Sequence, residues 1–414
     1  MSSVSKPPRG GEASPKKRPQ HPEFDPIPEE AGKATILLHA GRRPERNAGA
    51  VVAPIFQTST FHFPSNFSES SEFGDTYLYT RNRNPMHEVL EEKLRRVEGG
   101  ESARVFGSGM GAITTTLLSL LKPGDEIVAL EDLYGGTLSL LQTVLPKFGI
   151  RVRWVPHEEA GEPERLVGPG TRLVHLETPT SPLLRVHDIR RWADATHRSG
   201  ALLSVDNTFA TPINQNPIPL GADLVVHSAT KYLGGHHDLL AGAVIGRREL
   251  IERIDPRVVF GSVLDPLAAF LLDRGMKTLA LRVERQNETG RAVAESLVTH
   301  PKVEHVYYPG HNNPTDEEIA RRQMRGRGGV VSVSVKGGLD GAHRFLKALR
   351  LVHVASSLGG VETLASLPVE TSHVHLKSEE LASRGIAAGL VRLSVGLEEP
   401  EDILRDLRHG LDAA

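Results

Sequence analysis

Cysteine is absent from this chain, which excludes disulfides, thiolate nucleophiles and zinc sites with cysteine ligands. No apolar run approaches the roughly 20 residues that span a bilayer, and the N-terminus lacks the apolar core of a signal peptide. The formal net charge is only −2, so neither a nucleic acid nor a membrane is expected as a partner. From these absences we expect a soluble protein of the cytoplasm.

Two domains and a sizeable buried core are expected for a chain of 414 residues. Proline, glycine, serine and charged residues dominate the N-terminal stretch, MSSVSKPPRGGEASPKKRPQHPEFDPIPEE. Such a segment buries too little apolar surface to offset the entropy that it loses on ordering. Residues 1–35 are therefore predicted to form a disordered tail.

Short apolar runs alternate with helical segments from residue 101 to residue 246. Near-continuous apolar strands separated by amphipathic helices indicate a mainly parallel sheet covered on both faces. Helices are predicted over TLSLLQTVLPKF and over IRRWADATHRS, the second with Asp188 as its N-cap and Gly200 at its end. The predicted strands are ARVF, EIVAL, IRVRWV, RLVHLE, ALLSV, DLVVH and AGAVIG.

The rest of the chain has a different pattern. A long helical stretch, LDPLAAFLLDRGMKTLALRVERQNETGRAVAESLVTH, is expected to connect two parts of the molecule. Beyond it, GGVVSVSVKGG and LVRLSVGLE alternate like strands. They predict a smaller mixed domain at the C-terminus.

Ligands of a parallel sheet bind beyond the carboxyl ends of its strands, so the residues that follow each strand are the candidates. GSGMGA, with Gly109 and Met110, follows the strand ARVF and opens a helix. Free N–H groups and the positive end of a helix dipole bind anions there, although a glycine turn without a ligand fits this segment equally well. Tyr134, in the segment after EIVAL, either caps the core or stacks on a planar ligand.

Two further strand ends carry charged residues. Asp206 closes the strand ALLSV with no basic neighbour in sequence, as a turn former or as the counter-ion of a cationic ring. Lys231 follows the strand DLVVH, with the hydroxyls of Ser228 and Thr230 beside it. A desolvated amine near positive charge has a lowered pKa, which carbonyl condensation requires.

Together these groups describe one ligand. It has a phosphate for the helix N-terminus, a planar ring for Tyr134, a basic ring nitrogen for Asp206 and an aldehyde for Lys231. Pyridoxal 5′-phosphate (PLP) has all four groups, and its protonated ring withdraws electrons from the substrate Cα. The combination predicts a PLP site although each piece alone is a weak signal.

The sequence resembles the trans-sulfuration family of PLP-dependent enzymes, of the cystathionine γ-lyase and γ-synthase type. The resemblance covers residues 36–414. Its strongest part is DLVVHSATKYLGGHH, which fits the family's lysine signature at every defined position. The other segments that carry it are HAGRRPERNAGAVVAPIFQTSTF, YTRNRNP, GSGMGAI, LYGGT, ETPTSPLL, DNTFATP, SLGGVETL and GLVRLSVGLE.

The resemblance implies the PLP-dependent transferase fold type I, with a mainly parallel seven-stranded sheet in a large domain and a smaller C-terminal α/β domain. It implies an N-terminal arm at residues 36–70 that contacts a neighbouring subunit, a large domain at 71–262 and a small domain at 263–414. The assembly implied is a homotetramer, a dimer of dimers with active sites shared between subunits.

Residue roles also follow from the resemblance. Lys231 is implied to bond to the cofactor's aldehyde and then to move protons between substrate carbons, helped at the leaving group by Tyr134. Cofactor binding is implied for Tyr134, Asp206, Gly109, Met110, Ser228 and Thr230, and for Tyr79 and Arg81 of YTR from the neighbouring subunit. Substrate binding is implied for Arg392, at the α-carboxylate, and for Ser357.

Three positions depart from the family pattern. Ser181 stands in PTSP where asparagine is usual, and Ser356 where enzymes that act on cystathionine often have glutamate. His237 in GHHD replaces a commoner serine. Two adjacent histidines point apart in the chain and no carboxylate set accompanies them, so no metal site is expected.

Several functions stay open at this point. The first choice is γ-elimination or γ-replacement on sulfur amino acids or homoserine derivatives. The alternatives are a cystathionine β-lyase or an O-acylhomoserine sulfhydrylase, which Ser356 favours, and a methionine γ-lyase, which the absence of cysteine disfavours. A non-catalytic relative and an aminotransferase fit the combined residues less well.

Overall fold

The computed structural model describes residues 27–28, 30–43, 49–62, 77–254 and 257–414. Most of the predicted tail and, within the predicted arm, residues 44–48 and 63–70 lie outside the described residues. Helix α1 begins within the last three residues assigned to the tail. The domain boundaries given above stay a prediction.

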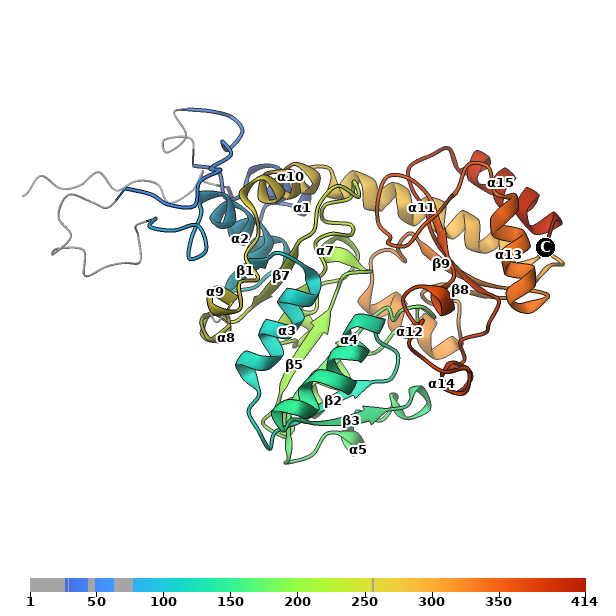
Figure 1. Ribbon diagram of the computed structural model, residues 1–414, viewed down its shortest axis with the longest axis horizontal. Coiled ribbons are helices and arrows are strands. Elements are labelled where there is room, and N and C mark those ends of the chain that lie inside the picture. Colours follow the sequence, from blue (N-terminus) through green and yellow to red (C-terminus); the bar gives the residue numbers. More distant parts are fainter. Residues whose placement is uncertain (1–26, 29, 44–48, 63–76, 255–256) are drawn as a thin grey trace, which may run out of the picture.

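A seven-stranded sheet forms the centre of the larger part of the molecule (Figure 1). Its strand order is β1-β7-β6-β5-β4-β2-β3, and β7 runs antiparallel to β1 and β6 whereas the other neighbours are parallel. All seven predicted strands are present, which confirms the mainly parallel sheet. Their bounds are β1 (Ser102–Phe106), β2 (Glu126–Leu130), β3 (Arg151–Val155), β4 (Thr171–Glu177), β5 (Leu202–Asp206), β6 (Leu224–His227) and β7 (Gly242–Gly246).

Helices cover both faces of this sheet. Because successive side chains of a strand point to opposite faces, each strand contributes to two hydrophobic cores. In β6, Val225 packs into a core with α1, α2 and α10, whereas Leu224 and Val226 pack into a core with α3 and α4. The helices of this part are α1 (Lys33–His39), α2 (Pro85–Glu98), α3 (Gly109–Leu120), α4 (Gly135–Ser139), α5 (Pro163–Leu166), α6 (Ile189–Arg198), α7 (Thr211–Asn214), α8 (Arg248–Arg253), α9 (Arg257–Phe260) and α10 (Pro266–Met276).

One predicted helix is present as expected and another is not regular. Asp188 caps α6 by accepting a hydrogen bond from the Arg191 N–H at 3.2 Å, and Gly200 beyond the helix has a φ of 71°. The segment predicted as one helix over residues 137–148 instead passes from α4 into a π-helical turn (Leu140–Val144) and a 3-10 turn (Leu145–Phe148). Pro146 explains the change, because it lacks the N–H that a regular helix needs.

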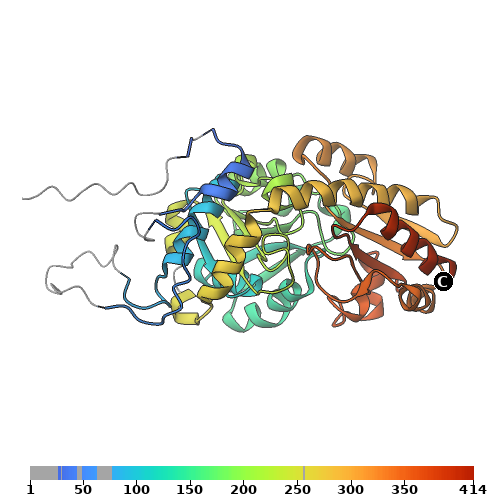
Figure 2. The same ribbon diagram turned by 90° about the horizontal axis from the view of Figure 1, so that it is seen from above.

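A second sheet of five strands lies in the C-terminal part, in the order β10-β11-β12-β9-β8. The long helix α11 (Leu279–Val298) runs from the larger part, where it contacts α1 and α7, to this sheet, where it packs on β8 and β9 (Figures 1 and 2). This second sheet and its helices confirm the smaller mixed domain predicted from the sequence. Its elements are β8 (Val303–Tyr307), α12 (Pro314–Gln323), β9 (Val330–Val335), α13 (Gly338–Ala348), β10 (His353–Val354), β11 (Leu364–Ser366), α14 (Ser378–Ser383), β12 (Leu390–Ser394) and α15 (Pro400–Asp412).

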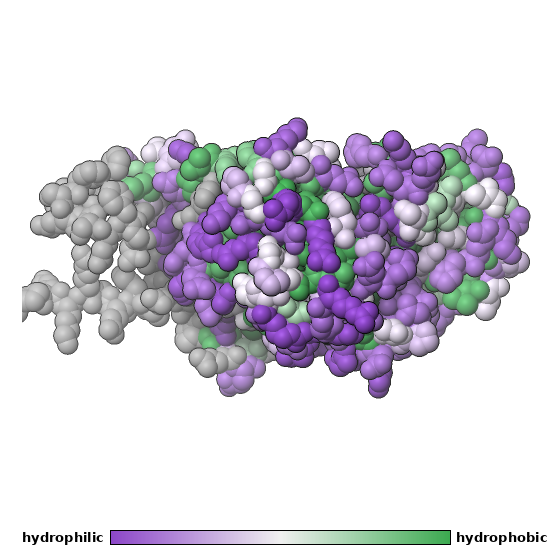
Figure 3. Space-filling view, turned by 90° about the horizontal axis from the view of Figure 1, so that it is seen from below, coloured by the Kyte–Doolittle hydropathy of each residue, from purple (hydrophilic) through white to green (hydrophobic). Residues whose placement is uncertain are grey.

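One face of the molecule is mainly polar. Hydrophilic residues cover most of the face shown in Figure 3, with a few hydrophobic side chains between them. None of the helices in the described ranges combines the length and the apolar character that crossing a bilayer requires.

Candidate active site

A cavity of about 490 Å³ lies beyond the carboxyl ends of β4, β5 and β6. Nearly all the side chains that the sequence singled out meet in it, although they come from both parts of the chain. Of the predicted site residues, those that line it are Gly109, Met110, Tyr134, Asp206, Ser228, Thr230, Lys231, Ser357 and Arg392. Tyr79 and Arg81 do not.

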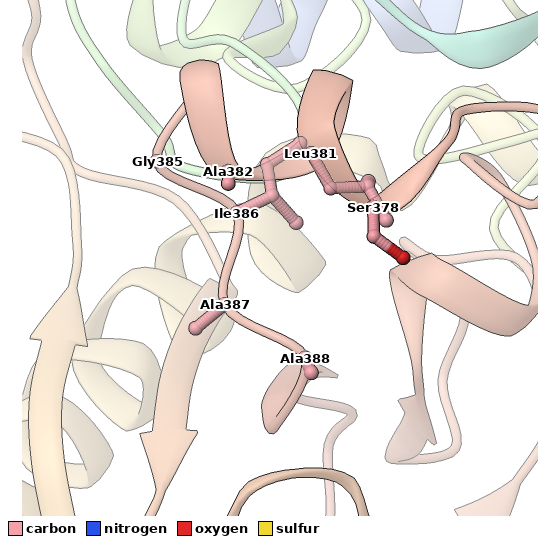
Figure 4. A pocket seen from close by; sticks show the side chains of 7 residues that line it. All are labelled: Ser378, Leu381, Ala382, Gly385, Ile386, Ala387 and Ala388. Carbon is pink, nitrogen blue, oxygen red and sulfur yellow. The ribbon is translucent and has the colours of Figure 1, made fainter.

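Another hollow, of about 360 Å³, lies at α14 and the loop after it (Figure 4). Its lining is Ser378, Leu381, Ala382, Gly385, Ile386, Ala387 and Ala388, which includes no titratable side chain. It therefore lacks the acid, base and charged groups that bind and activate an amino acid, whereas the first cavity has them.

The N-terminal turn of α3 opens onto the first cavity. Ser108 caps this helix by accepting a hydrogen bond from the Gly111 N–H at 3.0 Å. The backbone of Gly109 comes so close to Ser228 that a Cβ at residue 109 would lie 2.7 Å from the Ser228 Cβ. The helix N-terminus and the Ser228 hydroxyl therefore lie side by side as hydrogen-bond donors, which suits a phosphate.

Lys231 stands in the turn after β6, and its side chain is largely buried. Its Nζ donates a hydrogen bond to the Ser357 Oγ at 2.9 Å, which joins the large sheet to the C-terminal part. Burial, and next the positive charge of Arg392, lower the pKa of Lys231 to about 8. At pH 7 a minor fraction of this amine, about a tenth, is therefore neutral and nucleophilic, far more than for an ordinary lysine.

Arg392 on β12 supplies the cavity's buried guanidinium. Its side chain is 5 % exposed, and its Nη2 donates to the Ser357 carbonyl oxygen at 3.2 Å. Its Nε, also buried, has no hydrogen-bond partner among the described residues. Burial lowers the pKa of Arg392, and the neighbouring Tyr134 and Glu177 oppose this shift. This geometry suits a carboxylate brought by a substrate.

Two carboxylate residues stand next to each other at the ends of β4 and β5. Glu177 and Asp206 are register partners at the ends of these strands, and both line the cavity. Asp206 accepts a hydrogen bond from the Thr208 N–H at 2.9 Å. Buried His175 lies near Asp206, whose charge opposes the lowering of the His175 pKa by burial. Asp206 is thus placed as an anion for a cationic ring.

The residue that departs from the family pattern at position 181 lines the same cavity. The Ser181 Oγ is buried and has no hydrogen-bond partner among the described residues. An oxygen atom of a ligand is a suitable partner for it. Ser356 also lines the cavity, so no carboxylate stands at that point.

His237 does not line the cavity, and its backbone has a φ of 56°. Its ring lies directly against Gly360, where a Cβ would be 1.9 Å from the His237 Nε2. The His237 ring therefore fills the space that a side chain at position 360 would need, so glycine fits there. Within the described ranges, no group of three or more His, Asp or Glu side chains is arranged to hold a metal ion.

Tyr79 and Arg81 line a separate hollow of about 400 Å³ that shares no residue with the main cavity. The Arg81 guanidinium lies 5.5 Å from the centre of the Tyr79 ring, and its Nη1 donates to the Val258 carbonyl oxygen at 3.2 Å. Tyr79 is 42 % exposed. Within one chain these two residues do not complete the cavity.

Sequence reasoning missed Glu177 and Thr208, which also line the cavity. The Thr208 Oγ1 accepts a hydrogen bond from the Ser228 N–H at 2.8 Å and so fixes the segment before Lys231. Glu177 closes the run RLVHLE as Asp206 closes its neighbour, and a carboxylate at the end of an apolar strand was a usable signal.

The residues present fit PLP. A phosphate cradle, a carboxylate for the ring nitrogen, an aromatic side chain and an amine with a lowered pKa converge on one cavity, with an unpaired buried guanidinium nitrogen in the same wall. These are the groups that PLP and an amino-acid substrate require together.

Comparison with known proteins agrees with this geometry. The Cys/Met metabolism PLP-dependent enzyme family matches residues 34–412. The chain is 42 % identical over 389 residues to the L-methionine γ-lyase of Pseudomonas putida, covering 92 % of this chain and 98 % of that protein. It is 40 % identical over 382 residues to the cystathionine γ-lyase of Bacillus subtilis, covering 92 % and 99 %.

A solved structure shows the same fold. The crystal structure of cystathionine γ-lyase from Lactobacillus plantarum complexed with L-serine matches with a TM-score of 0.87 and 36 % identity, covering 92 % of this chain and 99 % of that chain. The resemblance inferred from the sequence motifs and the fold type expected from it are confirmed. The chain belongs to the Cys/Met metabolism family of PLP-dependent enzymes, and PLP is its cofactor.

Proposed function

We propose that this protein catalyses γ-elimination or γ-replacement on sulfur amino acids or homoserine derivatives, as in trans-sulfuration. The observation that carries the proposal is the Lys231 amine, which has a pKa of about 8 and lies in the same cavity as the Arg392 guanidinium. The relatives at 40 % and 42 % identity, named as γ-lyases, support γ-chemistry over β-chemistry. A cytoplasmic location stays a prediction.

The cofactor would be held by residues already placed around the cavity. The α3 N-terminus with Gly109 and Met110, and the hydroxyls of Ser228 and Thr230, suit its phosphate. Asp206 suits the ring nitrogen and Tyr134 the ring face. When bound, PLP supplies an electron-withdrawing ring that stabilises negative charge at the substrate Cα.

The chain's own side chains would do the remaining work. Arg392 holds the substrate α-carboxylate, which orients the Cα–H bond toward Lys231. The neutral Lys231 Nζ takes a proton from Cα and, for γ-chemistry, also moves a proton at Cβ. Ser357 accepts a hydrogen bond from this amine when it is free and so orients it within the cavity. Tyr134 is the proposed acid–base helper at the leaving group.

The Lys231 pKa predicts how cofactor binding to the apoprotein depends on pH. Below a pH of about 8 most of the amine is in the ammonium form, which has no lone pair to attack the cofactor's aldehyde. The rate of PLP binding should therefore rise with pH and level off above that value. Replacing Arg392 with glutamine removes a positive charge that lowers this pKa, which should move the curve to higher pH. Stopped-flow absorbance would record both curves; a flat wild-type profile or a shift to lower pH in R392Q would contradict the expectation.

We further propose a homotetramer in which Tyr79 and Arg81 serve the cavity of a neighbouring subunit. Neither residue lines the cavity of its own chain, and Arg392, the arginine that does line it, is assigned to the substrate carboxylate. An arginine for the phosphate would therefore come from a neighbouring chain, which supports this arrangement. Tyr79 is also 42 % exposed, as expected of a side chain whose contacts lie on another chain.

Subunit mixing tests the shared site. Lys231→Ala and Arg81→Ala are each expected to be inactive alone, but their co-expressed mixture should recover about a quarter of wild-type activity, because half of the dimers then contain one intact site. The matched control is a mixture of Lys231→Ala with Asp206→Asn. Both of those changes affect the same cavity, so that mixture should stay inactive. No recovery in the first mixture, or equal recovery in the control, would contradict the shared site.

Product analysis tests the reaction type. With cystathionine, the release of 2-oxobutanoate and cysteine supports γ-elimination, whereas pyruvate and homocysteine would show a β-lyase. Methionine and O-acylated homoserines belong in the same panel. Ser356 leaves that part of the cavity wall without a carboxylate, which favours substrates with an uncharged γ-substituent, such as methionine or an acylated homoserine, as the second candidate.

A further inference from the structure

Glu177 is a buried carboxylate with no role in the chemistry described so far. It ends β4, in register with Asp206 at the end of β5, and it lines the cavity with only 4 % of its surface exposed. Burial, and next the negative charge of Asp206, raise the pKa of Glu177. A second acidic group beside Asp206 is costly, so its contacts should indicate what it contributes.

Both carboxylate oxygens of Glu177 hold backbone groups at the cavity wall. Oε2 accepts a hydrogen bond from the Tyr134 N–H at 2.8 Å, and Oε1 accepts one from the Ser181 N–H at 2.8 Å. One side chain thus ties together two segments that are far apart in sequence. Each segment places a side chain in the cavity, the Tyr134 ring and the Ser181 hydroxyl.

The Tyr134 ring is only partly enclosed by the chain, and it lies against Gly136, where a Cβ would be 2.5 Å from the ring's Cε1. It is 43 % exposed, and Tyr134 is the N-cap residue of α4, without a side-chain cap hydrogen bond. Its backbone is therefore the point at which its position is set. The segment continues into Gly135, whose close contact with the Ser372 carbonyl oxygen leaves no room for a side chain.

We propose that Glu177 is a positioning residue, which fixes Tyr134 and Ser181 on the cavity wall so that the tyrosine ring faces the cofactor. The inference rests on the proposed role of Tyr134 in holding PLP. Glutamate is suited to this task because its two equivalent oxygens accept from both N–H groups at once. Glutamine offers one acceptor only and turns its NH₂ group toward the other N–H.

Hydrogen exchange in the apoprotein tests the positioning directly. Glu177→Gln should speed amide exchange in peptides that contain Tyr134 or Ser181 by about 10-fold, the equivalent of one lost hydrogen bond to a charged group. Asp406→Asn is the matched control. Asp406 is also a buried carboxylate, and it accepts hydrogen bonds from the N–H groups of residues 350, 351 and 352 in the C-terminal part, none of which lines the cavity. It should speed exchange there and leave Tyr134 and Ser181 unchanged.

Cofactor affinity tests whether the positioning matters. Glu177→Gln should raise the PLP dissociation constant about 10-fold and alter the visible circular dichroism of bound PLP, whereas Asp406→Asn should change neither. In a Tyr134→Ala background the further effect of Glu177→Gln should be smaller than in the wild-type protein, because Glu177 acts in part through Tyr134. Should Glu177→Gln fail to fold, Glu177→Asp, which keeps the charge but shortens the reach, should give the same local pattern.

Three results would overturn the inference: unchanged exchange at Tyr134 and Ser181, a full additional loss in the Tyr134→Ala background, or an equal loss of PLP affinity in Asp406→Asn. Failure of the proposed function is distinguishable. In that case wild-type protein would bind PLP normally but release no product from any substrate of the panel, and the exchange results would be unaffected.

Discussion

Replacing Lys231 with alanine is expected to lower kcat by at least about 10³-fold and to remove the visible absorbance of bound PLP. Its amine is the nitrogen nucleophile that the cavity offers at a pKa of about 8, within hydrogen-bonding distance of Ser357. Alanine leaves the surrounding turn intact, since that turn is held by backbone bonds such as the Lys231 N–H to the Ser228 carbonyl oxygen at 3.1 Å. Thermal unfolding should therefore change little, while activity is lost.

Lys33 provides a matched control for this experiment. Its pKa is also lowered to about 8, chiefly by burial, but its Nζ bonds to the Pro212 carbonyl oxygen and the Asn216 Oδ1, outside the cavity. Lys33→Ala should keep both the absorbance and the activity. If Lys231→Ala retained more than a tenth of wild-type turnover, or if Lys33→Ala lost as much, a lowered lysine pKa would not identify the catalytic amine.

Replacing Arg392 with glutamine is expected to lower kcat/KM for amino-acid substrates by about 10²-fold, mainly through KM. The guanidinium is buried with an unpaired Nε, and it is anchored through Nη2 on the Ser357 carbonyl oxygen. A substrate carboxylate would satisfy it. Arg392→Lys keeps the charge but loses the planar fork, so it should recover only part of the loss.

A substrate analogue that lacks the α-carboxylate separates binding from general damage. Wild-type protein and Arg392→Gln should process this amine at similar, low rates, because neither forms the contact. A loss as large with the analogue as with the amino acid would mean that Arg392 supports the fold rather than the carboxylate. Initial rates with both compounds, at matched PLP occupancy, decide between these outcomes.

Much of the large sheet could be predicted from the sequence because its strands other than β3 are largely buried on both faces. Continuous apolar runs such as EIVAL and DLVVH mark such strands directly, and the parallel arrangement places their carboxyl ends at one edge. The residues just after these strands could therefore be assigned to one ligand from the sequence alone. Asp206 and Lys231 are the clearest cases.

Contacts between the two parts of the chain could not be predicted in this way. The bond from Lys231 to Ser357 spans 126 positions, and no local pattern in either segment encodes it. The position of Glu177 at a strand end could have been noticed, but its partners could not be predicted, because they are backbone N–H groups, which nearly every segment has. The irregular helix after Tyr134 was predicted as regular although a local signal against it was present. The apolar periodicity was given more weight than Pro146, which interrupts a regular helix.

Chemical trapping tests the central claim most directly. Borohydride reduction of the purified holoprotein, followed by proteolysis and mass spectrometry, would convert a bond between the cofactor aldehyde and an amine into a stable pyridoxyl label. We expect one label, on the peptide that contains Lys231, and none in Lys231→Ala. A label on a different lysine of native protein, or no label in protein saturated with PLP, would contradict the assignment of Lys231 as the amine that bonds to the cofactor.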